Sequence, residues 1–290
     1  MRILVVGASG LVGWNCMSVA LQAGHTVLGT FNKFPLKSLV HLSLDSERAI
    51  SELMNDFKPE VVICCAAWSW VDGCQSDPER AFRQNCDEPA RLARAAHAIG
   101  AKVVHFSTSY VFDGKAGPYH EEDQPNPISI YGESKLAGEF AVLEETNRSA
   151  LIIRTMGVYG KEPQQKNFVY QVIRNLSEGR RMKVPSDQFG NASYAPDLAL
   201  GVLRLLNQNL AGAWNLAGPN PDLCRKDFAL HIATECGLDA SLFDFVPTST
   251  LDQPAPRPLH GGLQIDKAKD ELRWTPLELD QISWDKFTRT

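Results

Sequence analysis

The sequence predicts an α/β fold in which a doubly wound parallel sheet carries a smaller C-terminal lobe. Three observations lead to this prediction: short apolar runs without polar alternation, amphipathic segments between them, and a glycine-rich loop directly after the first run. Apolar runs of this length are typical of parallel strands that are buried on both faces. A chain of 290 residues is long enough for a large core with an appended lobe.

Five apolar runs are the predicted strands, and they cover residues 3–6, 26–29, 61–66, 103–106 and 151–153. Between the third and fourth runs, residues 78–99 carry apolar side chains at near-helical spacing and end at Gly100, which predicts a helix. The recurring order of strand, helix and strand is typical of a doubly wound sheet.

The glycine loop after the first strand has the context of a dinucleotide site, because it opens a helix. Its predicted cofactor contacts are Gly7, Ser9, Gly10, Leu11, Val12 and Gly13. Gly7 permits a tight turn, Gly10 lets the backbone approach a pyrophosphate, and Gly13 allows close helix packing. The alternative is an ordinary strand-to-helix turn with chance glycines.

The end of the second strand bears on the choice of cofactor. An acidic residue there would bind the ribose 2′-hydroxyl of NAD, but this chain has Asn32 and Lys33. We therefore expect NADPH, with NADH as the alternative, and Lys33 either pairs with a 2′-phosphate or is simply solvated. Asp45 is predicted to contact adenine or to cap a helix.

The later part of the chain predicts a discontinuous lobe. The alternation of strand and helix is lost after residue 157, prolines accumulate between residues 247 and 258, and a regular pattern returns at 187–206 and 213–217. We assign residues 1–157 and 187–218 to a dinucleotide-binding domain. Residues 158–186 and 219–290 are assigned to the substrate-binding lobe.

Composition excludes several classes of function. The net charge of −5 comes without a Lys/Arg cluster, so nucleic acid is not an expected partner. No apolar run has the length of a signal-peptide core or a membrane span, so we expect neither secretion nor a membrane. Seven cysteines without CxxC spacing fit a reducing cytoplasm, and no His, Cys or Asp set has metal-site spacing.

A catalytic pair is predicted at Tyr131 and Lys135, which lie one helical turn apart and project from one face. A nearby ammonium stabilises phenolate and lowers the phenol pKa from about 10 towards neutrality, which suits proton transfer to a carbonyl. Thr108 and Ser109 follow a strand at the carboxyl edge, where a hydroxyl can bond the reacting carbonyl. The alternatives are a solvated helix face and local backbone bonds of the hydroxyls.

These residues resemble the extended short-chain dehydrogenases/reductases through GxxGxxG at 7–13, Ser-Thr at 107–108 and Tyr-Gly-Glu-Ser-Lys at 131–135. More narrowly, STSYVFDG at 107–114, YGESKLAGE at 131–139, DQFG at 187–190 and Arg257-Pro258 resemble the dTDP-4-dehydrorhamnose reductases. That family reduces a nucleotide-linked 4-keto sugar with NAD(P)H.

The resemblance implies roles for individual residues. Thr108 would orient the carbonyl, Tyr131 would donate the proton, and Lys135 would also hold the nicotinamide ribose. The remaining implied contacts are Ala66 and Ala67 for the cofactor, Ser109, Tyr110, Gly157 and Arg257 for the substrate, and Asn85 for ordering the active-site helices.

The chain also departs from the family pattern where the substrate is expected. Ser109 stands where the reductases usually have Asp, Gly157 where they have Trp, and His260-Gly261 where they have Asn-Ser. The resemblance therefore implies the reaction class more firmly than the identity of the sugar.

Two other functions stay open. One is an epimerase or dehydratase whose cofactor is recycled within a turnover. The other is a non-catalytic NADP-binding subunit, because the regulatory partner of methionine adenosyltransferase shares the Thr-x-Tyr-Val-Phe-Asp-Gly pattern of residues 108–114. A homodimer is expected as the default for soluble enzymes.

Overall fold

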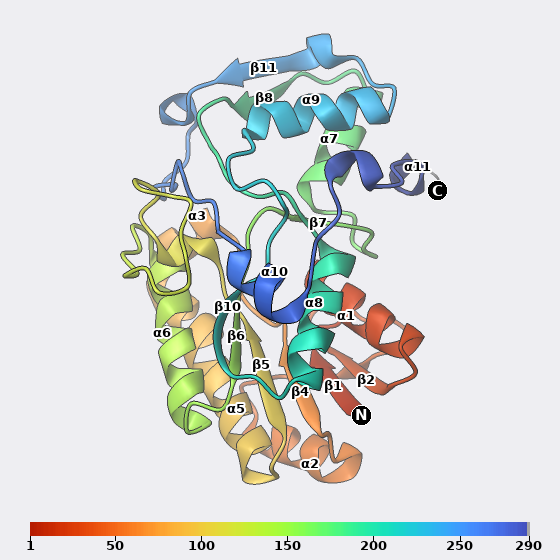
Figure 1. Ribbon diagram of the computed structural model, residues 1–290, viewed down its shortest axis with the longest axis vertical. Coiled ribbons are helices and arrows are strands. Elements are labelled where there is room, and N and C mark those ends of the chain that lie inside the picture. The colour runs from red at the N-terminus through yellow and green to blue at the C-terminus, as the bar shows by residue number, and fades with distance from the viewer. Residues whose placement is uncertain (289–290) are drawn as a thin grey trace.

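Seven parallel strands form the central sheet of the computed structural model, which describes residues 1–288. Their order across the sheet is β10-β6-β5-β4-β1-β2-β3 (Figure 1). The strands are β1 (Arg2–Val6), β2 (Thr26–Phe31), β3 (Val40–His41), β4 (Val61–Cys64), β5 (Lys102–Phe106), β6 (Leu151–Arg154) and β10 (Gly212–Asn215). All five predicted strands are present, and the order reverses at β1, which confirms the doubly wound fold.

Both faces of the sheet are buried because consecutive side chains of each strand point to opposite sides. In β1, Ile3 and Val5 enter one apolar cluster while Leu4 and Val6 enter another. The first face is covered by α1 (Leu11–Gln22) and α8 (Ala195–Asn207), and the second by α2 (Glu47–Phe57), α5 (Glu88–Ala98) and α6 (Ile130–Glu145). The continuous apolar runs of the sequence therefore correspond to strands covered by helices on both sides.

The predicted helix at 78–99 is interrupted in the structure. It consists of α4 (Pro78–Phe82), a π-helical turn η1 (Arg83–Asp87) and α5. Pro89 has no N–H to bond the carbonyl of Asn85 four residues earlier, which accounts for the break in the α-helical pattern. Gly138 of α6 packs against that carbonyl, so closely that a Cβ at residue 138 would overlap it. π-helical turns of this kind are frequent at functional sites.

The second structural unit, here called the lobe, lies above the carboxyl ends of the sheet strands (Figure 1). Its parallel strands β8 (Met182–Pro185) and β11 (Phe243–Val246) pack with α7 (Phe168–Ser177) and α9 (Arg225–Glu235). The remaining short elements are α3 (Val71–Ser76), η2 (Ser109–Val111), β7 (Val158–Tyr159), β9 (Ser193–Tyr194), η3 (Ala240–Leu242), η4 (Thr248–Thr250), α10 (Asp266–Leu272), η5 (Leu279–Gln281) and α11 (Asp285–Thr288).

Residues 263–274 pack with the sheet, whereas the sequence assigned all of 219–290 to the lobe. Leu263, Ile265 and Trp274 belong to the same apolar cluster as Ile3, and α10 lies against α8 and β10. The indole N–H of Trp274 donates to the carbonyl of Asp197 at 3.0 Å. A helix as short as α10 shows too few turns for its apolar face to be recognised in the sequence.

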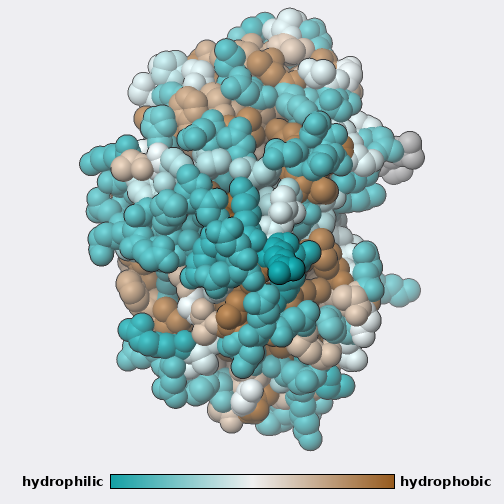
Figure 2. All heavy atoms as spheres, viewed as in Figure 1, coloured by the Kyte–Doolittle hydropathy of each residue, from teal (hydrophilic) through white to brown (hydrophobic). Residues whose placement is uncertain are grey.

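The surface is predominantly polar on the face drawn in Figure 2, where apolar side chains form small separate groups. No helix within the described part of the chain is long and apolar enough to cross a bilayer. All seven cysteines are free thiols.

Candidate active site

A cavity of about 860 Å³ lies between the carboxyl edge of the sheet and the lobe. Its volume is within the range of pockets that hold small molecules and cofactors. The predicted site residues that line it are Gly10, Leu11, Val12, Gly13, Ala67, Thr108, Ser109, Tyr110, Tyr131, Lys135 and Gly157. Outside its lining are Gly7, Ser9, Asn32, Lys33, Asp45, Ala66 and Arg257. The structure thus gathers the glycine loop and the predicted catalytic residues around one space.

The glycine loop has the geometry that a pyrophosphate requires. Gly7 has a φ of 84°, in the left-handed region that favours glycine. A Cβ at residue 13 would overlap the carbonyl oxygen of Gly7, so only glycine lets α1 begin this close to β1. Gly10 is the N-cap of α1 and contributes no side-chain bond, which leaves the N–H groups of the first turn for an anion. These residues fit a dinucleotide.

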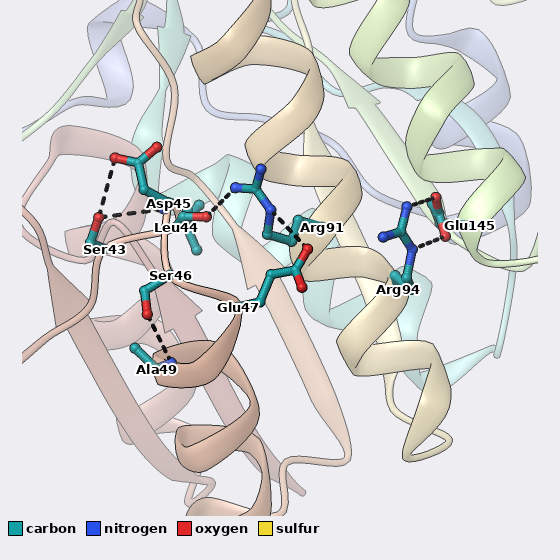
Figure 3. A network of polar contacts seen from close by, with 9 residues as sticks. All are labelled: Ser43, Leu44, Asp45, Ser46, Glu47, Ala49, Arg91, Arg94 and Glu145. Atoms are coloured by element: carbon teal, nitrogen blue, oxygen red, sulfur yellow. Dashed lines mark hydrogen bonds and ion pairs between the residues drawn. The ribbon is translucent and has the colours of Figure 1, made fainter.

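The loop that carries Asp45 is fixed by its neighbours (Figure 3). The hydroxyl of Ser46 accepts the N–H of Ala49 at 3.1 Å, so Ser46 caps α2 and the alternative of Asp45 as the helix cap is wrong. Arg91 donates to the carbonyl of Leu44 at 2.5 Å. This leaves the adenine contact of Asp45 as a prediction.

The predicted cofactor contacts Asn32 and Lys33 follow directly on β2 and are exposed. Beyond them, Phe34 lines the cavity, and the ammonium of Lys166 from the lobe lies 4.1 Å from the centre of its ring. The lobe therefore reaches over the end of β2 at this point.

Lys135 is buried on α6 and its ammonium is held by the neighbouring strand. Its Nζ donates to the carbonyl of Phe106 at 2.6 Å and lies 3.3 Å from Nε2 of His105. Burial lowers the pKa of Lys135 to about 8, opposed by Cys64 and Glu139. Burial and Lys135 hold the pKa of His105 well below its ordinary value, so the neutral imidazole accepts from the ammonium.

Tyr131 shows a pKa shift opposite to the one predicted from its spacing. Burial raises its phenol pKa well above the ordinary value, and a hydrogen bond with Thr108 opposes the shift. Lys135 is not among the causes of this shift, and its ammonium bonds the carbonyl of Phe106 in β5. Tyr131 therefore holds its proton at neutral pH, which suits a proton donor.

Beneath the predicted catalytic residues lies a buried ion pair. Glu139 accepts from both Nε and Nη2 of Arg154, at 3.0 and 2.8 Å, and from the hydroxyl of Ser107 at 2.5 Å. The two charged side chains are only 4% and 7% exposed. Because Ser107 precedes Thr108, the pair fixes the strand end that carries the predicted carbonyl contact.

Asn85 links the helices around the site, in line with its implied role. Its amide oxygen accepts the N–H of Trp68 at 2.7 Å, and its NH₂ donates to the carbonyl of Trp68 and to the hydroxyl of Ser134 at 3.1 and 3.0 Å. Ser134 lies on α6 between Tyr131 and Lys135. The amide thus joins the segment after β4 to the catalytic helix.

On the substrate side, two residues of the cavity lining carry a buried hydroxyl without a partner among residues 1–288. These are Ser109 Oγ and Thr155 Oγ1, and a buried hydroxyl without a partner commonly bonds a ligand or water. Tyr110 meets Tyr131 edge to face, with ring centres 5.4 Å apart. Gly157 has a φ of 55°, and a Cβ there would overlap the carbonyl of Asn191, so this backbone requires glycine.

Arg257 is already paired. Its Nη2 lies 2.7 Å from a carboxylate oxygen of Asp72, and its Nη1 donates to the carbonyl of Ala255 at 2.7 Å. The predicted substrate contact of Arg257 would have to compete with this ion pair.

Several cavity residues were not found from the sequence, among them Trp68, Lys166 and Arg225. They come from loops and lobe elements without a recognisable pattern. Across residues 1–288 there is no group of three or more His, Cys, Asp or Glu side chains arranged to hold a metal ion.

The doubly wound sheet, the glycine loop after β1 and the Thr108, Tyr131 and Lys135 cluster define the class of extended short-chain dehydrogenases/reductases. Within that class, residues 1–281 match the family described as RmlD substrate binding domain, and the chain belongs to this family. It is therefore an NAD(P)-dependent oxidoreductase, which confirms the enzyme class predicted from the sequence.

Relatives and solved structures agree with this assignment. The chain is 34% identical to a probable low-salt glycan biosynthesis reductase of Haloferax volcanii, covering 94% of this chain and 92% of the relative. It is 34% identical to a dTDP-4-dehydrorhamnose reductase of Mycobacterium tuberculosis, covering 90% and 84%. The structure of a Bacillus anthracis dTDP-4-dehydrorhamnose reductase in complex with NADP superposes with a TM-score of 0.84 at 28% identity, covering 99% and 96%.

Proposed function

We propose that the protein reduces a keto group on a nucleotide-linked sugar, with NADPH as hydride donor and NADH as the alternative. The observation that carries the proposal is that the glycine loop and the Thr108, Tyr131 and Lys135 cluster line a single cavity. Among the relatives are dTDP-4-dehydrorhamnose reductases, which supports a 4-keto sugar as substrate. The nucleotide cofactor supplies the hydride when it is bound.

The residues of the chain perform the remaining chemistry. Thr108 holds the carbonyl oxygen by a hydrogen bond, and Tyr131 donates its proton to that oxygen as negative charge develops. Burial keeps the phenol protonated until then. Lys135 is mostly charged at neutral pH, and its proposed role is to hold the nicotinamide ribose.

We assign cofactor binding to residues 1–157 and 187–218, and substrate binding to the lobe together with Ser109, Tyr110 and Gly157. Ser9, Asn32, Lys33, Asp45, Ala66 and Ala67 keep their proposed cofactor roles, and Arg257 keeps its proposed substrate role. The unpaired state of all seven thiols supports a reducing compartment such as the cytoplasm.

The test measures loss of NADPH absorbance with a panel of nucleotide-linked 4-keto sugars. Replacing Tyr131 by Phe should lower kcat by about 10²- to 10⁴-fold, the usual contribution of general acid catalysis, while NADPH affinity is kept. Tyr170→Phe is the matched control, because Tyr170 belongs to the apolar cluster of the lobe and does not line the cavity.

Two outcomes would overturn the proposal. Conversion of the sugar without net NADPH consumption would indicate an epimerase or dehydratase. Binding of NADPH without turnover of any keto sugar would favour a non-catalytic subunit. The proposed homodimer is tested separately by light scattering, where a dimer has twice the 32.0 kDa of one chain.

A further inference from the structure

Arg225 is a cation in the cavity wall with no protein counter-charge. It is the first residue of α9, and its guanidinium lies 3.6 Å from the centre of the Phe168 ring. Among residues 1–288 its side chain makes neither an ion pair nor a hydrogen bond. Burial lowers its pKa to about 10, so it stays charged at neutral pH. Arg225 is partly exposed where it lines the cavity, so its charge is free to pair with an anionic ligand there.

The cavity itself offers no free carboxylate to Arg225. Glu162 is the acidic side chain in the described lining, and its Oε1 already accepts the N–H groups of Lys166 and Asn167 at 2.9 and 2.8 Å. The described lining otherwise contains the cations Lys135 and Lys166. The excess of positive charge is therefore available to a ligand.

Arg225 lies close to the predicted reaction centre. Burial raises the pKa of Tyr110, and the charges of Arg257 and Arg225 both oppose this rise, so Arg225 lies near a ring that contacts that of Tyr131. A sugar whose carbonyl meets Tyr131 extends across its ring to the anomeric carbon, which bears the diphosphate in a nucleotide sugar. The N-terminus of α9 also has no side-chain cap, so its dipole adds positive potential beside Arg225.

Resting on the proposed function, we infer that Arg225 binds the diphosphate of the nucleotide-linked substrate. Its planar fork of donors matches two phosphate oxygens. Arg257, which the sequence favoured for substrate binding, is less available because Asp72 neutralises it at 2.7 Å. The protein itself supplies an anion to Arg257, whereas residues 1–288 supply none to Arg225.

The experiment measures the affinity of the NADPH-loaded protein for dTDP, UDP, thymidine and uridine by calorimetry. Replacing Arg225 by Met should weaken the tighter-binding diphosphate by about 10- to 100-fold, as expected for a lost charged hydrogen bond, and leave its nucleoside unchanged. Arg225→Lys should lose less, because charge is kept while the bidentate geometry is lost. Arg174→Met, at an exposed arginine of α7 that does not line the cavity, is the comparison and should leave diphosphate affinity unchanged.

The inference is wrong if neither diphosphate binds the parent protein or if diphosphate affinity is unchanged in both Arg225 variants. It is also wrong if the affinities for diphosphate and nucleoside weaken equally, or if NADPH affinity weakens in place of diphosphate affinity. Glucuronic acid is included because a carboxylate offers similar oxygens. If only its binding depended on Arg225, the diphosphate assignment would be wrong. Thermal melting checks the folding of each variant. If Arg225→Met does not fold, the diphosphate affinity of Arg225→Lys tests the inference instead.

Failure of the proposed function gives a different result, since these measurements need no turnover. Diphosphate affinity that depends on Arg225 in a protein that reduces no keto sugar would leave the inference standing and reject the reductase.

Discussion

The buried pair of Glu139 and Arg154 predicts a large loss of stability when one partner is neutralised. Replacing Glu139 by Gln leaves the guanidinium of Arg154 buried, with 7% of its side chain exposed and no neutralising charge on its former partner. It also replaces the charged acceptor of the Ser107 hydroxyl. The change therefore removes a charge that three hydrogen-bond donors compensate at present, namely the Ser107 hydroxyl and two N–H groups of Arg154.

Breaking a buried pair from one side typically costs about 3–5 kcal/mol. For a chain of this size, one kcal/mol shifts Tm by about 2–4 °C, so Glu139→Gln should lower Tm by roughly 6–20 °C. Differential scanning calorimetry measures the shift directly. Replacing Glu139 by Leu and Arg154 by Met together should restore much of the loss, because no buried charge is then left unpaired.

The matched control is the exposed pair of Arg94 and Glu145 on α5 and α6 (Figure 3). Their side chains are 62% and 24% exposed, so Glu145→Gln should cost less than about 1 kcal/mol. Equal shifts in Tm for Glu139→Gln and Glu145→Gln would refute the reasoning that burial decides the strength of these pairs.

Two further predictions concern the cofactor loop and the pH dependence of stability. Gly13→Ala should weaken NADPH binding or destabilise the fold by about 1–3 kcal/mol, because the added Cβ overlaps the Gly7 carbonyl. Fluorescence titration measures NADPH affinity and thermal melting measures stability. If neither changed, the loop would have room for the Cβ and the reasoning would be wrong. Burial and Asp45 raise the pKa of Glu88 to about 7, so its stabilising protonated form is fully present below pH 4.5 and lost as the pH rises through 7. Glu88→Gln should therefore be more stable than the parent protein above pH 7, by on the order of 1–3 kcal/mol, and equally stable below pH 4.5. Urea unfolding measures the free energy of unfolding of both proteins at each pH. A difference between them that did not change with pH would contradict the prediction.

The elements that local sequence determines were predicted from it. Residues 3–6 of β1 are an uninterrupted apolar run because both faces of the strand are covered there, and Gly7 and Gly13 are required by local backbone geometry. Tyr131 and Lys135 share a helix, so their common position at the cavity follows from spacing alone.

Features that depend on distant contacts were not predictable in this way. Arg225 enters the cavity because α9 begins there, and nothing in its neighbourhood in the sequence reports that position. The raised pKa of Tyr131 depends on burial, which is a tertiary effect. Residues 263–274 pack against the sheet through Trp274 and its neighbours. The segment before them has no regular pattern, so the sequence did not indicate that the chain goes back to the sheet there.

The chain passes repeatedly between the sheet and the lobe, which has a mechanical consequence. After β7 it enters the lobe through α7 and β8, returns in α8 and β10, enters again through α9 and β11, returns in α10, and packs in the lobe once more with α11. Each of these connections joins the sheet to the lobe, so any opening of the cavity must bend every connection at once. Such a multiply tethered joint permits small rocking motions and resists wide separation, so ligands enter and leave a cleft whose width the covalent chain itself limits.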